Sequence, residues 1–469
     1  MPCPRLLVAL LPALLALLAP AVAADPVREE RPNVLFVAVD DLRPWVGAYG
    51  HPAAVTPHID RLVASGTRFD RAYCNVPVCG PSRASVLTGL RARSNQWRTA
   101  DLEGSFVSLP AHLGAAGYRT AALGKVLHHL DDRAEDWTTP PWRSAAMYHG
   151  EHDWAGYNHY GVWQAPSSAA HVNPGSGRGP YAEAADVPDE AYQDGQVAAR
   201  AVAELERLAA GDAPFFLAVG FWRPHLPFNA PKRYWDLYDR ADLPPAAHVD
   251  RPDAAPDRQR SSGEIDRYAL TGVRKDTDEF RAEARHAYLA AVSYVDANVG
   301  RLLDALDRLE LTEDTLVVLW SDHGFSLGES AFWGKHTTRH DALRVPLVLR
   351  VPGREQVAAT SELVELVDLY PTICELVGVP APAHLAGTSR AALLFDPQAA
   401  GAASVEARWS GCRALVTERH LYTRWGPAED AAERTLFDLV ADPHERRDLS
   451  DEAAAAELVA ELDRLLDGR

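Results

Sequence analysis

A thiol and an arginine stand close together in the run Cys79-Gly80-Pro81-Ser82-Arg83. The residues after them, from Ala84 to Gly89, predict a short helix that glycine ends, with Pro81 near its first position. The open N–H groups and the positive dipole end of such a helix suit an anion. We therefore interpret Cys79 as part of a reactive centre; the alternative is an ordinary buried cysteine before a helix.

Two further pairs of polar residues each follow an apolar, β-rich run. Asp40-Asp41 ends the run 33–39, and Asp322-His323 comes just after the run 316–320. If both runs are central strands of one parallel sheet, their carboxylates and the imidazole meet at one edge. Carboxylates packed together repel one another, and an oxygen-rich set suits Ca²⁺ or Mg²⁺ better than zinc. For Asp40-Asp41 taken alone, a solvated turn or a helix cap is the plainer alternative.

Lysine is rare in this chain, which has 47 Lys and Arg residues. Arginine stands at most positions where either residue would serve, so a retained lysine hints that a compact point charge is needed. Lys232 and Lys275 lie in polar stretches, where chance explains them. Lys125 and Lys335 remain as the two informative lysines.

Alternating β-rich and helical patterns indicate an α/β sandwich with a large, mainly parallel central sheet flanked by helices. Active groups in such folds gather at the carboxyl ends of the strands. Strands are expected at 33–39, 119–123, 215–219, 316–320 and 346–351, and helices at 56–65, 193–209 and 280–307. After residue 404, short strands at 405–409, 413–417, 420–425 and 434–439 and a helix at 451–466 predict a small C-terminal antiparallel-sheet domain.

The chain divides into three predicted parts: a signal peptide at 1–24, a catalytic domain at 25–395 and a C-terminal subdomain at 396–469. Arg5, the apolar run 6–19 and the small residues 21–23 have the order of a secretory signal. We expect an exported, soluble protein without a membrane anchor. The few cysteines form no disulfide framework, and Asn-x-Ser/Thr acceptors are absent, which fits a bacterial periplasmic or secreted protein. The net charge of −18 disfavours nucleic acid as a partner.

The motifs together resemble the type I sulfatase family over nearly the whole chain after the signal. The matching segments, in the family's order, are 33–41, 79–83, 124–125, 224–225, 321–324 and Lys335. The local sequence is most similar to the iduronate-2-sulfatase branch of the family at 39–44, 124–128, 215–228 and 293–296. The resemblance implies an alkaline-phosphatase-like fold and a sulfuric ester hydrolase.

The resemblance also implies a metal and a modified residue. Asp40, Asp41, Asp322 and His323 would hold one Ca²⁺ together with a formylglycine that a maturation enzyme makes from Cys79. In this family one hydroxyl of the hydrated aldehyde attacks sulfur and displaces the sugar alcohol. The other hydroxyl is then deprotonated, which expels sulfate and restores the aldehyde.

Further roles are implied for basic side chains. Arg83 would stabilise the hydrate, and Lys125 and Lys335 would contact the hydrate and the sulfate. His128 would be the base that assists the expulsion of sulfate from the sulfated intermediate, and His225 would bind sulfate and protonate the leaving oxygen. Their neighbours His129 and His336 are interpreted as structural.

The substrate is less constrained by sequence. Phe325 and the run 330–332 depart from the family pattern, and Arg98 and Arg223 are candidates for a uronate carboxylate. We expect a sulfated carbohydrate, with a 2-O-sulfated uronate as one option. A phosphatase or phosphonate hydrolase of the same superfold and a non-catalytic carbohydrate-binding relative are the alternatives. An aromatic-rich stretch could stack on sugar rings or simply pack down; it contains Trp137, Trp142, Tyr148, Trp154, Tyr157, His159, Tyr160 and Trp163.

Overall fold

The computed structural model describes residues 1, 31–144, 173, 175–176, 178–252, 255–270, 272–426 and 433–468. Residues 32–469 belong to one compact unit. The predicted signal peptide, apart from Met1, and the aromatic residues from Tyr148 to Trp163 lie outside the described residues. Among the helices that are described, none is long and apolar enough to cross a membrane.

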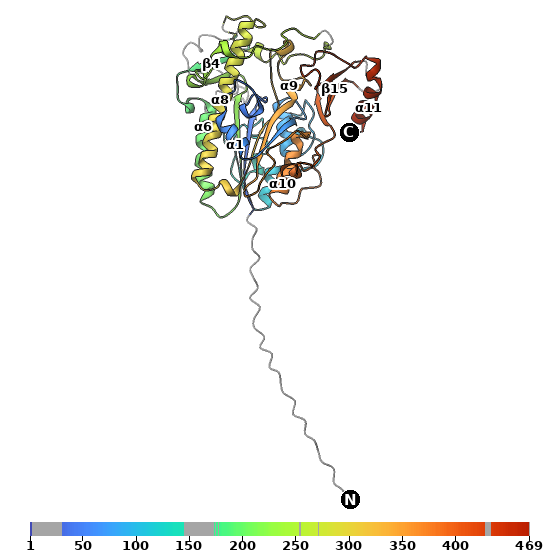
Figure 1. Cartoon of the computed structure of the whole chain (residues 1–469). Helices are drawn as coiled ribbons and strands as arrows, with labels where there is room; N and C mark the ends of the chain where they lie inside the picture. Colours follow the sequence, from blue (N-terminus) through green and yellow to red (C-terminus); the bar gives the residue numbers. More distant parts are fainter. Residues whose placement is uncertain are drawn as a thin grey trace. The chain divides into compact units, whose positions relative to one another are not determined.

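A central sheet organises the chain (Figure 1). Within the described residues it has eight strands, in the order β11-β2-β10-β7-β1-β5-β3, with β12 paired to β2. The strands at one edge are β11 (Ala359–Thr360) and β12 (Val364–Glu365), and both pair with β2 (Thr67–Tyr73). Strand β1 (Asn33–Asp40) lies between β7 (Thr315–Ser321) and β5 (Phe215–Pro224) and is parallel to both. Strand β3 (Arg119–Gly124) is parallel to β5, whereas β10 (Arg344–Arg350) is antiparallel to its neighbours. The sheet is therefore mainly parallel, as predicted.

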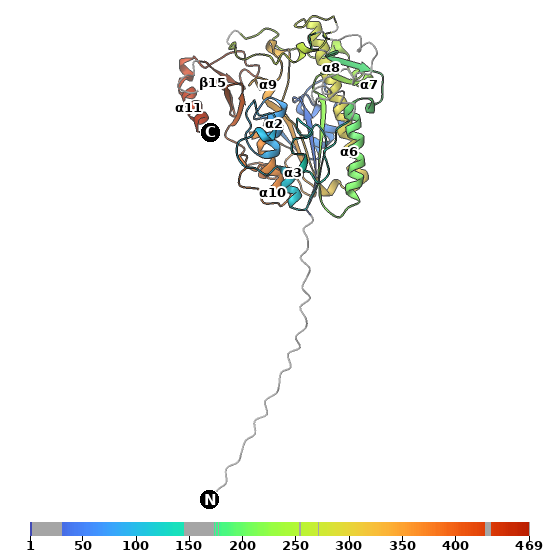
Figure 2. The same cartoon turned by 180° about the vertical axis from the view of Figure 1, so that it is seen from behind.

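Both faces of the sheet are buried, which is why its central strands read as continuous apolar runs. Along β1, Leu35, Val37 and Val39 face one apolar cluster and Val34 and Phe36 face another. The first cluster includes side chains of α1 (Pro57–Ala64), α6 (Gln193–Ala209) and α8 (Asp278–Arg308). The second includes side chains of α2 (Cys79–Thr88), α3 (Leu109–Ala115) and α10 (Leu369–Leu376), which Figure 2 shows.

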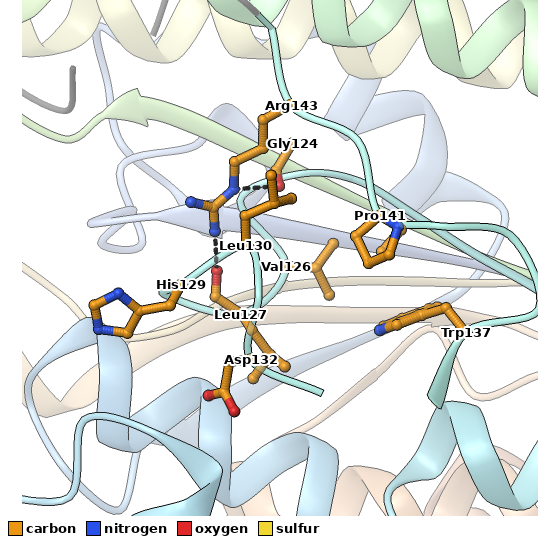
Figure 3. Close-up of a pocket in the computed structure, with 10 residues that line it drawn as sticks. Gly124, Val126, Leu127, His129, Leu130, Asp132, Trp137, Pro141 and Arg143 are labelled. Atoms are coloured by element: carbon orange, nitrogen blue, oxygen red, sulfur yellow. Dashed lines mark hydrogen bonds between the residues drawn. The ribbon is translucent and has the colours of Figure 1, made fainter. Parts of the chain in front are cut away.

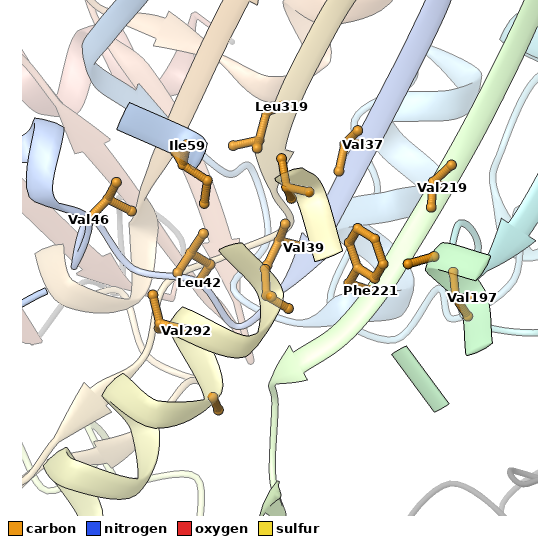
Figure 4. Close-up of a cluster of buried hydrophobic side chains, with 14 of the residues drawn as sticks. Val37, Val39, Leu42, Val46, Ile59, Val197, Val219, Phe221, Val292 and Leu319 are labelled. Carbon is orange, nitrogen blue, oxygen red and sulfur yellow. The ribbon is translucent and has the colours of Figure 1, made fainter. Parts of the chain in front are cut away.

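Figure 4 shows how the first cluster joins the strands to the helices. Val37 and Val39 of β1 lie near Leu319 of β7 and Val219 of β5. Val292 of α8, with Ile59 and Val197 of the other helices, belongs to the same cluster. This packing fixes the strand ends, where the polar groups of the chain gather.

Strand β2 and helix α2 differ from the sequence prediction. Strand β2 (Thr67–Tyr73) was not predicted, because Arg68, Asp70 and Arg71 interrupt its apolar pattern. Helix α2 begins at Cys79 rather than near Pro81, so Cys79 lies in its first turn instead of before it. Pro81 is accommodated there because the first N–H groups of a helix have no partner within the helix. Gly89, with φ of 71°, ends the helix as expected.

The C-terminal strands form a separate antiparallel sheet within the described part of the chain. One face of this sheet packs on α11 (Ala456–Asp467), and its other face contributes to the second cluster of the central sheet. Helix α11 begins later than the predicted 451, after a short 3-10 turn. The boundary between the catalytic domain and the C-terminal subdomain at 395/396 remains a prediction. The strands are β13 (Val405–Trp409), β14 (Cys412–Val416), β15 (His420–Trp425) and β16 (Glu433–Asp438).

Candidate active site

The adjacent ends of β1 and β7 bring the predicted acidic residues together. Asp40 ends β1, and Val39 pairs with Ser321, so Asp41 lies beside Asp322. The backbone N–H of Asp41 donates to Oδ1 of Asp322 at 3.2 Å. Asp41 has a φ of 62°, a left-handed conformation that aspartate tolerates better than most residues. These side chains and that of His323 are fully buried, so the solvated-turn alternative does not apply.

Cys79 joins this edge from the start of α2. Its Sγ lies 3.2 Å from Nε2 of His323. One potential ligand atom from each of Asp40, Asp41, Cys79 and His323 falls within a group whose members are all within 4.8 Å of one another. Nδ1 of His323 lies 3.0 Å from the carbonyl oxygen of Gly324, which assigns the proton to Nδ1 and leaves the Nε2 lone pair for the group. The cluster has the donor set of a cation site.

Asp322 is adjacent to this group but is not one of its four members. Its Oδ1 lies 3.6 Å from Nε2 of His323. Its Oδ2 accepts from Nε of Arg83 at 2.8 Å, and its Oδ1 accepts from the backbone N–H of His323 at 3.0 Å. The role of Asp322 as a direct metal ligand therefore remains a prediction.

Three buried cationic side chains surround the carboxylates. Lys125 follows β3 and forms an ion pair with Asp40, and Nη2 of Arg83 lies 3.5 Å from Oδ1 of Asp40. Lys335 donates to both carboxylate oxygens of Asp41, at 2.8 and 3.0 Å. The structure therefore places all three predicted basic residues against the predicted acidic pair.

The pKa values of the two adjacent aspartates are shifted in opposite directions by their surroundings. Burial opposes ionisation of Asp40, but Lys125, His225 and Arg83 outweigh it and hold its pKa well below the usual value. At Asp41 burial dominates over the attraction of Lys335 and raises the pKa to about 7. Burial and Asp40 also raise the pKa of the Cys79 thiol well above its usual value. A divalent cation would favour the ionised form of Asp41, so the residues present fit such an ion.

The two predicted catalytic histidines lie beside the cationic side chains. His225 follows β5; its Nδ1 lies 2.6 Å from the carbonyl oxygen of Leu226, and its Nε2 lies 4.0 Å from Oδ2 of Asp41. Burial and Lys335 lower the pKa of His225. His128 lies in the loop after β3, 5.1 Å from the ring of Trp97, and burial with Lys125 lowers its pKa well below the usual value. The proton-transfer roles of both histidines remain predictions.

Glu264 is a charged residue of the site that sequence reasoning missed. Its Oε1 lies 3.2 Å from Nε2 of His225, and its Oε2 lies 3.2 Å from Nζ of Lys335. Burial opposes its ionisation, but Lys335 and His225 outweigh burial and hold its pKa well below the usual value. Glu264 lies in the stretch 240–275, where no periodicity or motif marks it. Only the three-dimensional contact with Lys335 reveals it.

Arg143 is a second missed residue, and it supports the loop that carries Lys125 and His128. Figure 3 shows its guanidinium against the backbone of this loop. Its Nε donates to the carbonyl of Gly124 at 3.2 Å, and its Nη2 donates to the carbonyls of Leu127 and His128 at 2.6 and 3.0 Å. The loop begins at a glycine for a steric reason: Gly124 has a φ of 74°, and a Cβ there would lie 2.1 Å from the carbonyl oxygen of Gly220.

The remaining candidates have structural roles, except Arg98, which lies at the surface. Arg223 is buried and donates to the carbonyl oxygen of His225, so it supports the site backbone and does not present a free charge. His336 stacks on Trp409 with ring centroids 4.7 Å apart, and Trp137 stacks on Phe216 in the core. Arg98 stays at the surface, with 39% of its side chain exposed, where it pairs with Asp131 at 3.0 Å.

The mainly parallel α/β sandwich brings four possible metal ligands and three buried cationic side chains to one edge of the sheet, an arrangement that suits the hydrolysis of charged esters. The family model described as Sulfatase matches residues 32–379, and the model described as N-sulphoglucosamine sulphohydrolase, C-terminal, matches 328–468. The chain therefore belongs to the sulfatase family and is a sulfuric ester hydrolase, which confirms the predicted family and enzyme class.

A curated relative agrees with this assignment, and two solved structures show the same fold. Iduronate 2-sulfatase of Homo sapiens is 33% identical over 407 residues, which cover 75% of this chain and 70% of the relative. Phosphonate monoester hydrolase of Agrobacterium radiobacter superposes with a TM-score of 0.75 at 24% identity, over 93% and 95% of the two chains. A protein solved in complex with its substrate D-glucosamine-2-N,6-O-disulfate superposes with a TM-score of 0.71 at 21% identity, over 94% and 97%. The alkaline-phosphatase-like fold is thereby confirmed.

Proposed function

We propose that this chain is a Ca²⁺-dependent sulfatase that removes sulfate from a sulfated carbohydrate through a formylglycine made from Cys79. The observation that carries the proposal is the cluster of Asp40, Asp41, Cys79 and His323 within 4.8 Å. Arg83, Lys125 and Lys335 are packed against the same cluster. Side chains that could hold a cation and side chains that could hold an anion thus lie in one buried cluster.

The donor set supports a hard divalent cation. Carboxylate oxygens of Asp40 and Asp41, with Asp322 at their side, are the ligands that Ca²⁺ prefers, and His323 adds one nitrogen. When bound, the cation would polarise an ester oxygen and stabilise negative charge. Such an ion would also reduce the repulsion between the adjacent buried carboxylates.

An unmodified Cys79 is a poor candidate for the nucleophile. Thiolates react and thiols do not, and burial raises the pKa of this thiol. A formylglycine at this position, installed by a formylglycine-generating enzyme, would supply a hydrated aldehyde with two hydroxyl groups. Residue 79 lies in the first turn of α2, where the positive end of the helix dipole favours negative charge.

The other side chains have roles that follow from charge and position. Arg83, Lys125 and Lys335 stabilise the negative charge of the sulfate and the nucleophile. His225 presents Nε2 to the pocket and protonates the leaving oxygen, while His128 accepts a proton as sulfate departs. We also propose export of the protein, on the pattern of residues 1–24.

The substrate proposal is a 2-O-sulfated uronate. It is supported by the 33% identity to iduronate 2-sulfatase and by Arg98, which is exposed enough to pair with a carboxylate. The test uses protein produced together with a formylglycine-generating enzyme, assayed on disaccharides sulfated at the 2-O of the uronate or at the 6-O of the hexosamine. We expect release of sulfate from the 2-O isomer and none by Cys79→Ala.

Two results would contradict this assignment. Turnover of the 6-O isomer alone would reject the uronate substrate while leaving the sulfatase mechanism in place. Hydrolysis of an aryl phosphonate monoester in preference to every sulfated saccharide and to an aryl sulfate would instead favour the phosphonate hydrolase alternative.

A further inference from the structure

Glu264 brings a negative charge into a pocket that binds anions. Its carboxylate lies between His225 and Lys335, 3.2 Å from each, and 13% of its side chain is exposed. The backbone on its N-terminal side is anchored, since Ser262 N–H donates to the carbonyl of Trp333 at 3.0 Å and Trp333 N–H donates to Oγ of Ser261 at 3.1 Å. Glu264 is therefore held against the strand that leads to Lys335.

Neither of its partners depends on Glu264 for its position. Lys335 already donates to both oxygens of Asp41 at 2.8 and 3.0 Å. His225 already donates through Nδ1 to the carbonyl of Leu226 at 2.6 Å. The main consequence of Glu264 is thus electrostatic rather than mechanical.

The charge of the pocket can be counted from the side chains in mutual contact. Among the described residues, four carboxylates, three cationic side chains and one bound divalent cation sum to one net positive charge, and a His225 that donates from both ring nitrogens adds a second. Without Glu264 the net charge would be one unit more positive. The charged side chains are Asp40, Asp41, Asp322, Glu264, Arg83, Lys125 and Lys335.

We propose that Glu264 determines specificity by matching the pocket to singly charged esters and disfavouring doubly charged ones. A sulfate monoester carries one negative charge, whereas a phosphate monoester carries close to two above pH 7. A carboxylate near the bound ester repels the second charge as well as the first, so it penalises the phosphate more. The inference rests on the proposed function, because it uses His225 and Lys335 as contacts of the ester.

The same charge favours release of product. Hydrolysis converts a singly charged sulfate ester into doubly charged inorganic sulfate, which the site holds less tightly when its net positive charge is one unit lower. Glu264 therefore weakens product inhibition by sulfate. This second consequence is measured independently of the choice of substrate.

The experiment compares the wild type with Glu264→Gln, which removes the charge and keeps the shape. Asp266→Asn is the matched control, because Asp266 lies two residues further on, is 48% exposed and pairs with Lys275 outside the pocket. The ratio of kcat/KM for 4-nitrophenyl phosphate to that for 4-nitrophenyl sulfate is measured at pH 8 with Ca²⁺ present. We expect Glu264→Gln to raise this ratio about 10- to 100-fold, the effect of one charge at about 6 Å in a partly screened site. Its inhibition constant for inorganic sulfate should fall by a similar factor.

Three kinetic results would overturn the inference. One is an equal loss of kcat/KM for both esters, which would make Glu264 a positioning residue. The others are the same ratio change in Asp266→Asn or in Glu264→Asp, which keeps the charge. Calorimetric binding of inorganic phosphate to the Ca²⁺-loaded proteins decides the question even if the wild type does not hydrolyse sulfate esters. Equal affinity in wild type and Glu264→Gln would reject the charge effect, whereas an inactive wild type bearing the aldehyde would reject only the proposed function.

Discussion

Nε2 of His323 lies 3.2 Å from Sγ of Cys79, although the two residues are 244 positions apart in the chain. His323 comes from the end of β7, and Cys79 comes from the first turn of α2. Oγ of Ser82 donates to the carbonyl of Asp322 at 2.6 Å and ties the two elements together. Contacts between these two elements therefore hold Cys79 beside the possible metal ligands at the end of β7.

Asp322 tests this coupling most simply. Asp322→Ala removes the 2.8 Å partner of the buried Arg83, and breaking such a pair costs about 3 to 5 kcal/mol of the free energy of unfolding. We expect loss of turnover together with weakened Ca²⁺ binding, measured by calorimetry, and a lower midpoint in urea. Asp304→Ala, at an exposed pair with Arg61, is the control and should change stability by less than about 1 kcal/mol. Wild-type activity in Asp322→Ala would exclude Asp322 from the cation site.

Removal of divalent cations should affect activity and stability together. A ligand that binds only the folded state stabilises it, by about 2.7 kcal/mol at one hundred times its dissociation constant. We expect treatment with EGTA to abolish turnover and lower the Tm, and Ca²⁺ to restore both. Full activity in protein shown by elemental analysis to be free of metal would contradict the cation site at Asp40 and Asp41.

The turn at Gly124 gives a steric prediction with a matched control. Gly124 and Gly117 both have positive φ, of 74° and 97°, but only at Gly124 would a Cβ meet another backbone atom, 2.1 Å away. Gly117→Ala should cost about 1 kcal/mol of stability from backbone strain alone. We expect Gly124→Ala to cost at least about 2 kcal/mol more than that, as measured by chemical denaturation. Equal losses would show that the close approach to Gly220 is not a constraint.

Arg143 is predicted to act through the loop that it binds. Arg143→Ala leaves the carbonyls of Gly124, Leu127 and His128 without this donor and frees the segment that carries Lys125. We expect kcat to fall about 10- to 100-fold with a smaller change in KM, since misplacement near the reacting atoms mainly affects the transition state. Added guanidinium should restore part of kcat in Arg143→Ala. A change in stability without any change in kcat would limit Arg143 to a structural role.

Much of the fold and part of the site could be predicted from sequence because both leave local signals. The apolar runs at 33–39 and 316–320 indicated strands buried on both faces, and the carboxyl-end rule then placed Asp40 and Asp322 together. Helix α6 was predicted with its observed bounds, because its apolar positions recur at helical spacing. The pattern is long enough to predict this helix without knowledge of its tertiary contacts.

The parts that were missed depend on contacts between distant segments. Charged side chains hide the strand pattern of β2, and only its pairing with β10 makes it a strand. Glu264 and Arg143 carry no local signal, because their partners lie on other elements. The predicted start of α2 was wrong because Pro81 was taken to lie near the first helical position, although proline is tolerated throughout the first turn.

The central claim is that position 79 carries a formylglycine rather than a thiol. The direct test is mass spectrometry of the peptide that contains residue 79, from active protein produced in a host with a formylglycine-generating enzyme. We predict the mass of the aldehyde form, its reaction with a hydrazide, and activity in proportion to the aldehyde fraction. A fully active protein whose residue 79 is an intact thiol would contradict the proposed mechanism.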